Sequence, residues 1–393
     1  MPMLPAPRRA TRLRRRARRS PAILPLLLPL LLLPLAACEA PEAPRLEGDE
    51  LAALSPGWHA IRPGGETRCS DGSPYRFNVR RGDPQKLLVY LQGGGACWSW
   101  QTCNAGDDAP YDPVVDARDD PSRLGGIFDT TRAENPFGDY TMVFVPYCTG
   151  DVHLGRTVSR YDGPGGAQRA IHHAGYTNAR AALEWAFHNV LAPETVFVTG
   201  GSAGAIPSPL YAAFAARRYE GARVVQLGDG GGGYRFAPGM LPRLMDTWGA
   251  HAAAEELLGD AALPPEGVGQ PGAYTAAATR AQPDVTFAAI DSAEDEVQRY
   301  FLSLLNGQAP PSLLPFLQAN YDEVRASGAR FHTYVAGGAV HTILGRPAFY
   351  TEASGGVRLR DWVAALAAGE PAGDVACDAC APAEPVAEPV AAR

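Results

Sequence analysis

The sequence predicts an α/β protein in which helices flank a mainly parallel central sheet. Short runs rich in Leu, Val, Phe and Ile alternate along the chain with segments whose apolar residues recur every three or four positions. The apolar runs lack a regular alternation with polar residues, so each strand is expected to be buried on both faces. Strands that alternate with helices in this way are typical of a layered α/β fold.

Six strands and four helices follow from these patterns. The expected strands are Lys86–Leu91, Thr141–Pro146, Thr195–Thr199, Arg223–Leu227, Val285–Ile290 and Arg330–Val335. The expected helices are Asn178–Leu191, Pro207–Tyr219, Glu294–Leu305 and Leu359–Ala368. Residues 236–283 are rich in Ala, Gly and Pro, and we expect an insertion there that caps the carboxyl edge of the sheet.

Charge is distributed unevenly along the chain. The 393 residues carry a formal net charge of −7, but the first 37 include eight arginines and no acidic residue. The remainder holds 27 basic and 42 acidic residues, a net charge near −15. This balance argues against a nucleic-acid-binding protein and against a polybasic protein of the membrane surface.

The N-terminal 37 residues are predicted to be a signal peptide. Arginines precede the apolar run Ala22–Ala37, which is too short and too proline-rich for a comfortable membrane-spanning helix. Its end, Leu-Ala-Ala-Cys, resembles a bacterial lipobox, so Cys38 is the expected lipidation site of an exported, membrane-anchored protein. Glu39 after that cysteine favours the outer membrane. An ordinary signal peptide is the alternative.

The segments on either side of the folded domain have their own composition. Residues 38–55 are polar and contain proline, which predicts a tether to the membrane. Residues 56–369 are then predicted to form one large domain, and 370–393 a C-terminal tail that contains Cys377 and Cys380 and ends in low-complexity sequence.

Six cysteines remain once Cys38 is set aside, an even number that suits an oxidising compartment. Close spacing suggests the pairs Cys97/Cys103 and Cys377/Cys380, which leaves Cys69 with Cys148. Spacing alone still allows fifteen pairings, and a zinc site is the alternative for Cys377 and Cys380.

The motif Gly200-Gly-Ser-Ala-Gly204 is the sharpest chemical signal. It follows a hydrophobic strand and precedes a helical segment, which is the context of a nucleophile elbow, so Ser202 is the expected nucleophile. A phosphate-binding loop at a helix N-terminus is the alternative, but the Gly-Lys-Ser/Thr sequence of such loops is missing.

A serine hydroxyl needs a base to remove its proton and an acid to orient that base. His341 follows the last predicted strand and Asp291 follows the strand Val285–Ile290, in the order expected on this fold. We expect them to complete a triad with Ser202. Asp229, which also follows a strand, is the alternative acid.

Donors for the oxyanion are expected near the nucleophile. A glycine triplet at 93–95 directly follows the strand Lys86–Leu91. The predicted donors are the backbone amides of Gly94, Gly95 and Ala203. A disulfide between Cys97 and Cys103 would hold this loop in place, although a plain structural turn remains the alternative.

Several stretches together resemble the pectin acetylesterase/Notum family of serine esterases. They are Cys69-Ser-Asp-Gly-Ser-Pro, Leu91-Gln-Gly-Gly-Gly-Ala-Cys-Trp with Thr102-Cys103, Glu134-Asn-Pro, Met142–Asp151, the elbow motif and His341. The resemblance implies an α/β-hydrolase fold, a triad of Ser202, Asp291 and His341, no cofactor and no metal. It also supports the pairs Cys69–Cys148 and Cys97–Cys103.

The resemblance suggests a substrate class as well. Animal members carry an aromatic residue where Gly95 and Ala96 stand here, so a deep fatty-acyl pocket is not expected. A short acyl ester is expected instead, most plausibly an O-acetyl group on a glycan, and the acidic domain disfavours a polyanionic pectin. Trp98 and Trp100 are candidates for stacking on sugar rings. The alternatives are a hydrolase of other esters, such as polyhydroxyalkanoate or lipid-like substrates, and a catalytically silent binding lipoprotein.

Overall fold

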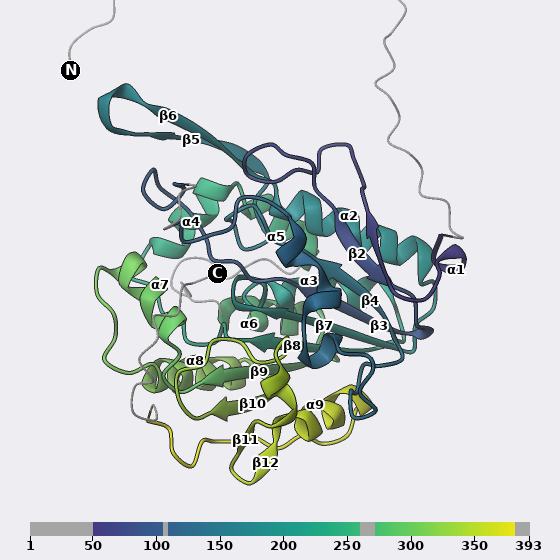
Figure 1. Cartoon of the computed structure of the whole chain (residues 1–393). Helices are drawn as coiled ribbons and strands as arrows, with labels where there is room; N and C mark the ends of the chain where they lie inside the picture. The colour runs from purple at the N-terminus through teal and green to yellow at the C-terminus, as the bar shows by residue number, and fades with distance from the viewer. Residues whose placement is uncertain (1–49, 105–108, 260–271, 382–393) are drawn as a thin grey trace, which may run out of the picture. The chain divides into compact units, whose positions relative to one another are not determined.

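The computed structural model describes residues 50–104, 109–259 and 272–381, and Figure 1 shows their arrangement. An eight-stranded sheet runs through the molecule in the order β1-β2-β4-β3-β7-β8-β9-β10. All neighbours from β4 to β10 are parallel, whereas β1 and β2 join the edge in antiparallel pairing. The prediction of a mainly parallel sheet flanked by helices is confirmed.

The strands of this sheet include the six predicted runs, to within a few residues, and two more at one edge. They are β1 (Trp58–Ile61), β2 (Phe77–Arg80), β3 (Asp83–Leu91), β4 (Tyr140–Val145), β7 (Thr195–Gly201), β8 (Arg223–Asp229), β9 (Thr286–Ser292) and β10 (Arg330–Ala336). Three short or separate pairs were not predicted. They are the antiparallel edge β1–β2, the pair β11 (Ala353–Ser354) and β12 (Val357–Arg358), and the hairpin of β5 (Thr157–Asp162) and β6 (Gln168–His173), which projects from the body in Figure 1.

The helices agree with the predicted ones and add others. They are α1 (Glu50–Ala53), α2 (Gly175–Asn189), α3 (Ser208–Arg218), α4 (Met240–Trp248), α5 (His251–Leu258), α6 (Gly272–Ala281), α7 (Glu296–Asn306), α8 (Leu314–Ala326) and α9 (Leu359–Ala368). Both α5 and α6 pack on α3, so the part of 236–283 that the structure describes extends the helical layer beside the sheet. Among the described helices none is both long and apolar enough to cross a bilayer.

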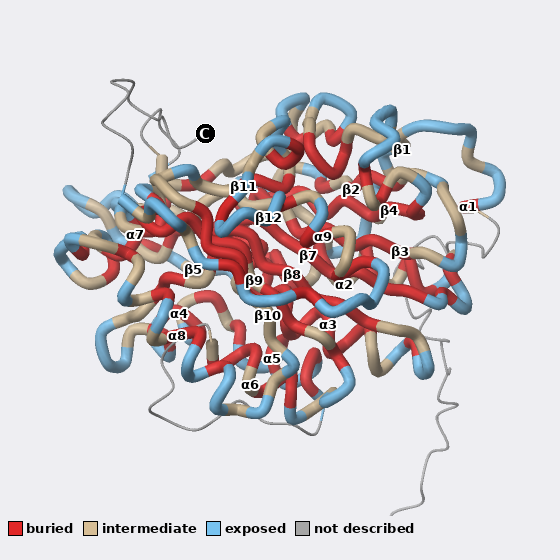
Figure 2. Tube along the Cα trace, turned by 90° about the horizontal axis from the view of Figure 1, so that it is seen from below, coloured by how far each residue is buried: buried red, intermediate tan, exposed pale blue. Residues whose placement is uncertain are grey.

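Both faces of the sheet are buried, as Figure 2 shows for the central strands. Alternate residues of β3 point to opposite sides: Leu87, Val89 and Leu91 join one apolar cluster with α2 and α3, while Leu88 and Tyr90 join another with α9. A strand buried on two faces needs apolar residues at every position, which explains the continuous runs in the sequence. Because β7, β8, β9 and β10 are parallel neighbours, their carboxyl ends lie side by side at one edge of the sheet.

The cysteines form the three predicted disulfides, Cys69–Cys148, Cys97–Cys103 and Cys377–Cys380. Residues 370–381 pack against the domain: Val335 N donates to Val375 O, and Val375 N donates to Thr333 O. The signal peptide and the lipidation site Cys38 lie outside the described residues. The domain boundaries stay predictions.

Candidate active site

Ser202 stands on a sharp turn at the carboxyl end of β7. Its φ is +52°, a conformation that residues with a side chain rarely adopt, and the turn continues as a short helix (Ser202–Gly204) toward α3. Position 204 requires glycine, because a Cβ at Gly204 would overlap the carbonyl oxygen of Leu91 at the end of β3. The sequence motif thus folds as the strand–turn–helix of a nucleophile elbow.

His341 lies on the loop after β10, beside this elbow. A Cβ at Gly230 would lie 3.2 Å from His341 Cε1, and a Cβ at Gly201 would lie 3.5 Å from the Thr342 methyl group. Ring atom Nε2 is buried and has no hydrogen-bond partner among the described residues. His341 therefore has an unpartnered ring nitrogen and lies on a loop that packs beside the elbow.

The carboxylate on the other side of the imidazole belongs to Asp295. Its Oδ2 lies 2.7 Å from His341 Nδ1, and the side chain is fully buried. Asp295 caps the N-terminus of α7, where its Oδ1 accepts from the backbone N–H of Val297 and Gln298. A carboxylate at Nδ1 fixes the tautomer with hydrogen on that nitrogen and leaves a lone pair on Nε2.

The prediction that Asp291 contacts His341 is wrong, because Asp295 occupies that position. Strand β9 continues to Ser292, so Asp291 lies inside the strand and faces the loop after β8 and helix α8. Its oxygens accept from Gly232 N at 2.9 Å, from Gln298 Nε2 at 2.8 Å and from Tyr321 OH at 2.5 Å. Burial raises the pKa of Asp291 to about 7. Asp291 therefore reaches the triad through Gln298 and makes no direct contact with the imidazole.

Asp229, the alternative acid, bonds to the backbone of the loop that carries His341 and not to the imidazole. It accepts from the backbone N–H of Ile343 and Leu344, at 2.8 to 3.1 Å, and burial raises its pKa to about 6. These bonds hold the chain directly after Thr342, which has a positive φ of +56°. Asp229 thus anchors the loop that carries His341.

A local signal for Asp295 is present in the sequence. The run Asp295-Glu-Val-Gln298 matches the pattern in which a cap residue is followed three positions later by Glu or Gln. This pattern marks the start of a helix, one turn after the end of β9, and places a carboxylate at the carboxyl edge of the sheet.

The glycine triplet packs against the nucleophile. A Cβ at Gly93 would lie 2.8 Å from Ser202 Cβ and 2.7 Å from Gly201 O, so the loop approaches as closely as only glycine permits. Gly94 and Gly95 both have positive φ, and Gly95 and Ala203 line a pocket with Ser202. Two of the predicted donors, Gly95 and Ala203, thus lie at the same pocket as Ser202.

Residue Gln92 ties this loop to its surroundings. Its carbonyl oxygen lies 2.8 Å from His153 Nε2, and its side chain donates to Asp119 and accepts from Tyr147 N. Burial lowers the pKa of His153 to about 4, so the ring is neutral and its Nε2–H donates to Gln92. His153 and Val152 both have positive φ, a strained segment that the sequence analysis missed.

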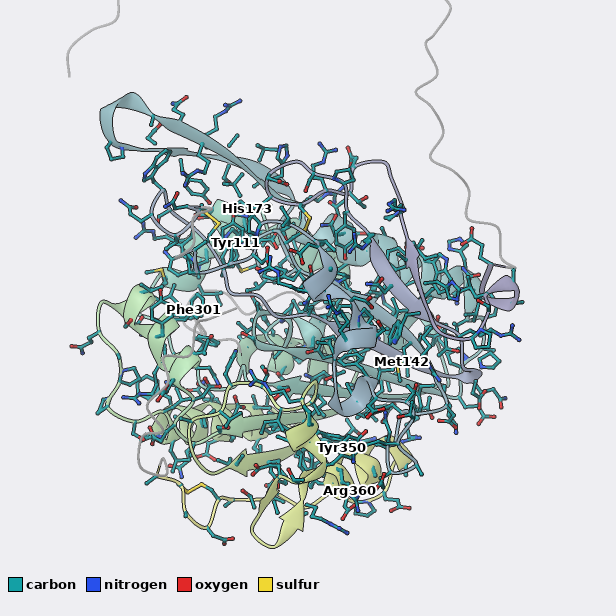
Figure 3. All side chains as sticks on the ribbon, in the orientation of Figure 1. Tyr111, Met142, His173, Phe301, Tyr350 and Arg360 are labelled. Atoms are coloured by element: carbon teal, nitrogen blue, oxygen red, sulfur yellow. A yellow bond between two sulfur atoms is a disulfide. The ribbon has the colours of Figure 1, made fainter. Side chains whose placement is uncertain are left out.

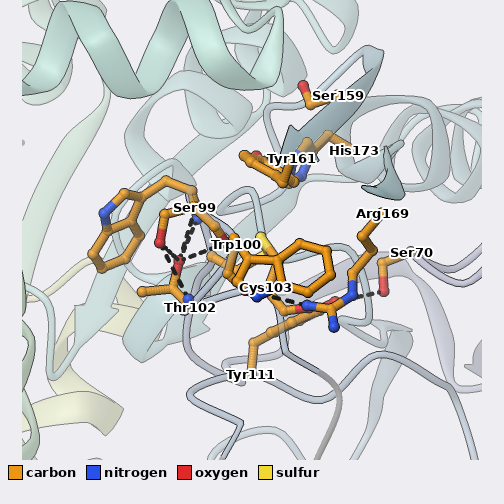
Figure 4. The surroundings of a disulfide bond; sticks show 12 residues. Ser70, Ser99, Trp100, Thr102, Cys103, Tyr111, Ser159, Tyr161, Arg169 and His173 are labelled. Atoms are coloured by element: carbon orange, nitrogen blue, oxygen red, sulfur yellow. Dashed lines mark hydrogen bonds between the residues drawn. A yellow bond between two sulfur atoms is a disulfide. The ribbon is translucent and has the colours of Figure 1, made fainter. Parts of the chain in front are cut away.

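The Cys97–Cys103 disulfide is held by the β5–β6 hairpin (Figure 4). Arg169 of β6 stacks on the Trp100 ring with 4.3 Å between guanidinium carbon and ring centroid, and donates to the carbonyl oxygens of Trp100 and Cys103. Arg169 thus covers one face of the Trp100 ring, a candidate for stacking on sugar rings. His173 lies near both sulfurs, but its nitrogens bond Tyr161 and Thr149, so this cluster offers no free metal-binding set.

A small apolar pocket opens beside Ser202. Its wall is apolar and comes from segments far apart in sequence, including Phe301 and Leu305 of α7; Figure 3 labels Phe301. The other lining residues are Gly95, Ala96, Trp98, Val152, Ala203, Ile206, Tyr234, Phe236, Leu244 and Trp248. Although Gly95 and Ala96 bring no aromatic ring, five aromatic residues line this pocket, four of them from outside this loop.

The sequence was compared with known families and proteins. A family model described as Pectinacetylesterase matches residues 62–235. Palmitoleoyl-protein carboxylesterase NOTUM of Schmidtea mediterranea is 33% identical over 101 residues, which are 24% of this chain and 19% of that protein.

Two vertebrate proteins give similar matches. The NOTUM carboxylesterase of Homo sapiens is 38% identical over 95 residues, 22% of this chain and 18% of that protein. An "inactive palmitoleoyl-protein carboxylesterase notum1b" of Danio rerio is 36% identical over 93 residues, 23% of this chain and 66% of that protein. The chain thus spans about a fifth of the planarian and human relatives and 66% of the zebrafish one.

Proposed function

Because the chain belongs to the pectinacetylesterase family through residues 62–235, we propose that it is a serine carboxylesterase. The observation that carries the proposal is the hydrogen bond between Asp295 and His341 beside the strained elbow of Ser202. The carboxylesterase names of the matched relatives support the same reaction class.

In the proposed mechanism, Ser202 Oγ attacks the ester carbonyl carbon while His341 Nε2 takes the hydroxyl proton. Asp295 stabilises the resulting imidazolium, and backbone amides of Gly94, Gly95 and Ala203 stabilise the oxyanion. The imidazolium then protonates the alkoxide leaving group, which departs as an alcohol. Water repeats the sequence on the acyl-enzyme and releases a carboxylic acid.

Labelling of Ser202 tests this proposal. A fluorophosphonate probe is expected to label the wild-type protein and to leave Ser202→Ala unlabelled, because the probe reacts with an activated serine. Ester hydrolysis should be lost in the same variant. A protein that neither reacts with the probe nor hydrolyses esters would instead be a binding protein on this fold. The zebrafish relative whose name calls it inactive is the reason to test this alternative.

The apolar pocket predicts a preference among acyl groups. Each buried CH₂ contributes about 0.8 kcal/mol, so two more carbons should raise kcat/KM about tenfold. We expect p-nitrophenyl butyrate to be hydrolysed about ten times faster than the acetate at low concentration. Leu244→Trp, which fills the pocket, should remove this preference while acetate hydrolysis continues.

Removal of O-acetyl groups from a glycan is the second candidate, favoured by the description of the matched family. It predicts acetate release from acetylated glycans and a kcat/KM for p-nitrophenyl acetate that equals or exceeds the value for the butyrate. A preference for the octanoate would exclude this candidate. Export and lipid anchoring at Cys38 belong to the same proposal, and the three disulfides support an oxidising compartment.

A further inference from the structure

Two buried carboxylates are joined by a single amide at the back of the candidate triad. Gln298 Nε2 lies 2.8 Å from Asp291 Oδ1 and 3.1 Å from Asp295 Oδ2. Its Oε1 accepts from Gly233 N at 2.8 Å, which fixes the orientation of the amide with the NH₂ group toward the acids. All three side chains are at most 1% exposed.

The two carboxylates accept different numbers of hydrogen bonds. Asp295 accepts from two backbone N–H groups, from the imidazole and from Gln298, so each of its oxygens accepts two hydrogen bonds. Asp291 accepts from Gly232, Gln298 and Tyr321 and has no cationic partner among these contacts. Asp291 accepts fewer hydrogen bonds and lies near the charge of Asp295, so it is the member of the pair expected to hold a proton near neutrality.

Several titratable groups face this pair from the surrounding elements. Tyr321 of α8 donates to Asp291, and Tyr234 of the loop after β8 lies close enough to feel the charge of both acids. Asp229 at the end of β8 faces His341 and Asp295. Burial, with a smaller contribution from the charge of Asp295, raises the pKa of Asp291 to about 7.

We propose that Gln298 and Asp291 are positioning residues of the triad: Gln298 holds the Asp295 carboxylate on His341, and Asp291 acts through it on the protonation of the imidazole. When Asp291 is ionised, its negative charge favours the imidazolium. When Asp291 is neutral, His341 gives up its proton at lower pH. The inference rests on the proposed function, because only a reacting imidazole gives it a kinetic consequence.

The test is the acid limb of the pH profile of kcat/KM, which reports the protonation of the base in the free enzyme. Asp291→Asn removes the ionisable group with little change in shape. We expect the limb to move to lower pH by less than about one unit, because Asp291 is already partly protonated over the limb and only its ionised fraction acts on the imidazole.

Two more variants separate this effect from a general loss of structure. Tyr321→Phe removes a donor that stabilises the Asp291 anion, so it should shift the limb in the same direction, and the double variant should shift it no further than Asp291→Asn alone. Asp322→Asn, the matched change at an exposed position beside Tyr321, should leave the limb in place.

Gln298→Met keeps the length of the side chain and removes both donors. It should lower kcat about ten- to hundredfold with little change in KM, because a hydrogen bond to a charged group is lost. An acid limb that does not move in Asp291→Asn, in an active enzyme, would overturn the role of Asp291. An unchanged kcat in Gln298→Met would overturn that of Gln298.

A titration of His341 by NMR keeps the test independent of catalysis. In Ser202→Ala with labelled histidine, the His341 signal, identified by its loss in His341→Gln, should titrate at lower pH when Asp291→Asn is added. If the wild-type protein shows no esterase activity and the shift is still seen, the coupling stands and the proposed function is overturned. The same titration with and without Asp291→Asn would overturn the coupling whatever the activity.

Discussion

Replacing Asp295 by asparagine is expected to lower kcat about 10⁴-fold, the loss seen when the acid of a serine triad becomes an amide. The amide oxygen is expected at the Oδ1 position, where two backbone N–H groups donate, so the NH₂ group faces His341 Nδ1. This donor drives the imidazole to the tautomer with hydrogen on Nε2, and that nitrogen then cannot take the proton of Ser202. The backbone bonds of the Asp295 Oδ1 atom to Val297 and Gln298 survive, so α7 should remain capped.

Steady-state hydrolysis of p-nitrophenyl butyrate measures this effect, and thermal unfolding checks that the fold is intact. Asp291→Asn is the matched control, because it makes the same change four residues earlier in an equally buried side chain. It should retain most of kcat at pH 8. If Asp291→Asn lost activity about 10⁴-fold and Asp295→Asn kept it, Asp291 would be the acid after all.

The elbow could be recognised from the sequence because its determinants are local. Ser202 needs a buried strand before it, a helix after it and small residues beside it, and all three requirements lie within about twenty residues. The strands of the sheet could be found for a similar reason, since burial on both faces leaves a continuous apolar run in each.

The sequence did not point to the carboxylate that contacts His341, because its position depends on where a strand ends. The apolar pattern ends at Ile290, but the hydrogen-bonded ladder with β10 continues through Ser292. Two extra residues move Asp291 from the loop into the strand and bring Asp295 to the edge of the sheet. Strand ends are set by partner strands, which a single sequence shows poorly, whereas the helix cap at Asp295 is a local pattern.

The pocket could not be predicted for a different reason. Its walls come from the loop after β3, the elbow, α4 and α7, which are brought together only by the order of the strands. The hairpin β5–β6 was also missed, although Gly163-Pro-Gly-Gly at its tip is a turn signal. Its strands alternate exposed and partly buried residues and contribute only a small apolar cluster around Tyr161 and Ile171.

Loss of the Cys69–Cys148 disulfide is expected to lower the free energy of unfolding by about 4 kcal/mol, the largest effect on stability that we predict. The bond joins residues 79 positions apart, so it removes many conformations from the unfolded chain. Both sulfurs are fully buried, and alanine is the suitable replacement because a serine hydroxyl would be buried there. Urea unfolding of Cys69→Ala/Cys148→Ala measures the change.

The matched control is Cys377→Ala/Cys380→Ala, which opens a loop of only three positions. Loop closure gives this bond about 2 kcal/mol, so the two double variants should differ by about 2 to 3 kcal/mol. Each variant replaces two cysteines of one disulfide by alanine, so the difference reflects loop length together with the deeper burial of Cys69 and Cys148. Equal losses would mean that local packing around the sulfurs, and not closure of the long loop between Cys69 and Cys148, stabilises this edge of the domain.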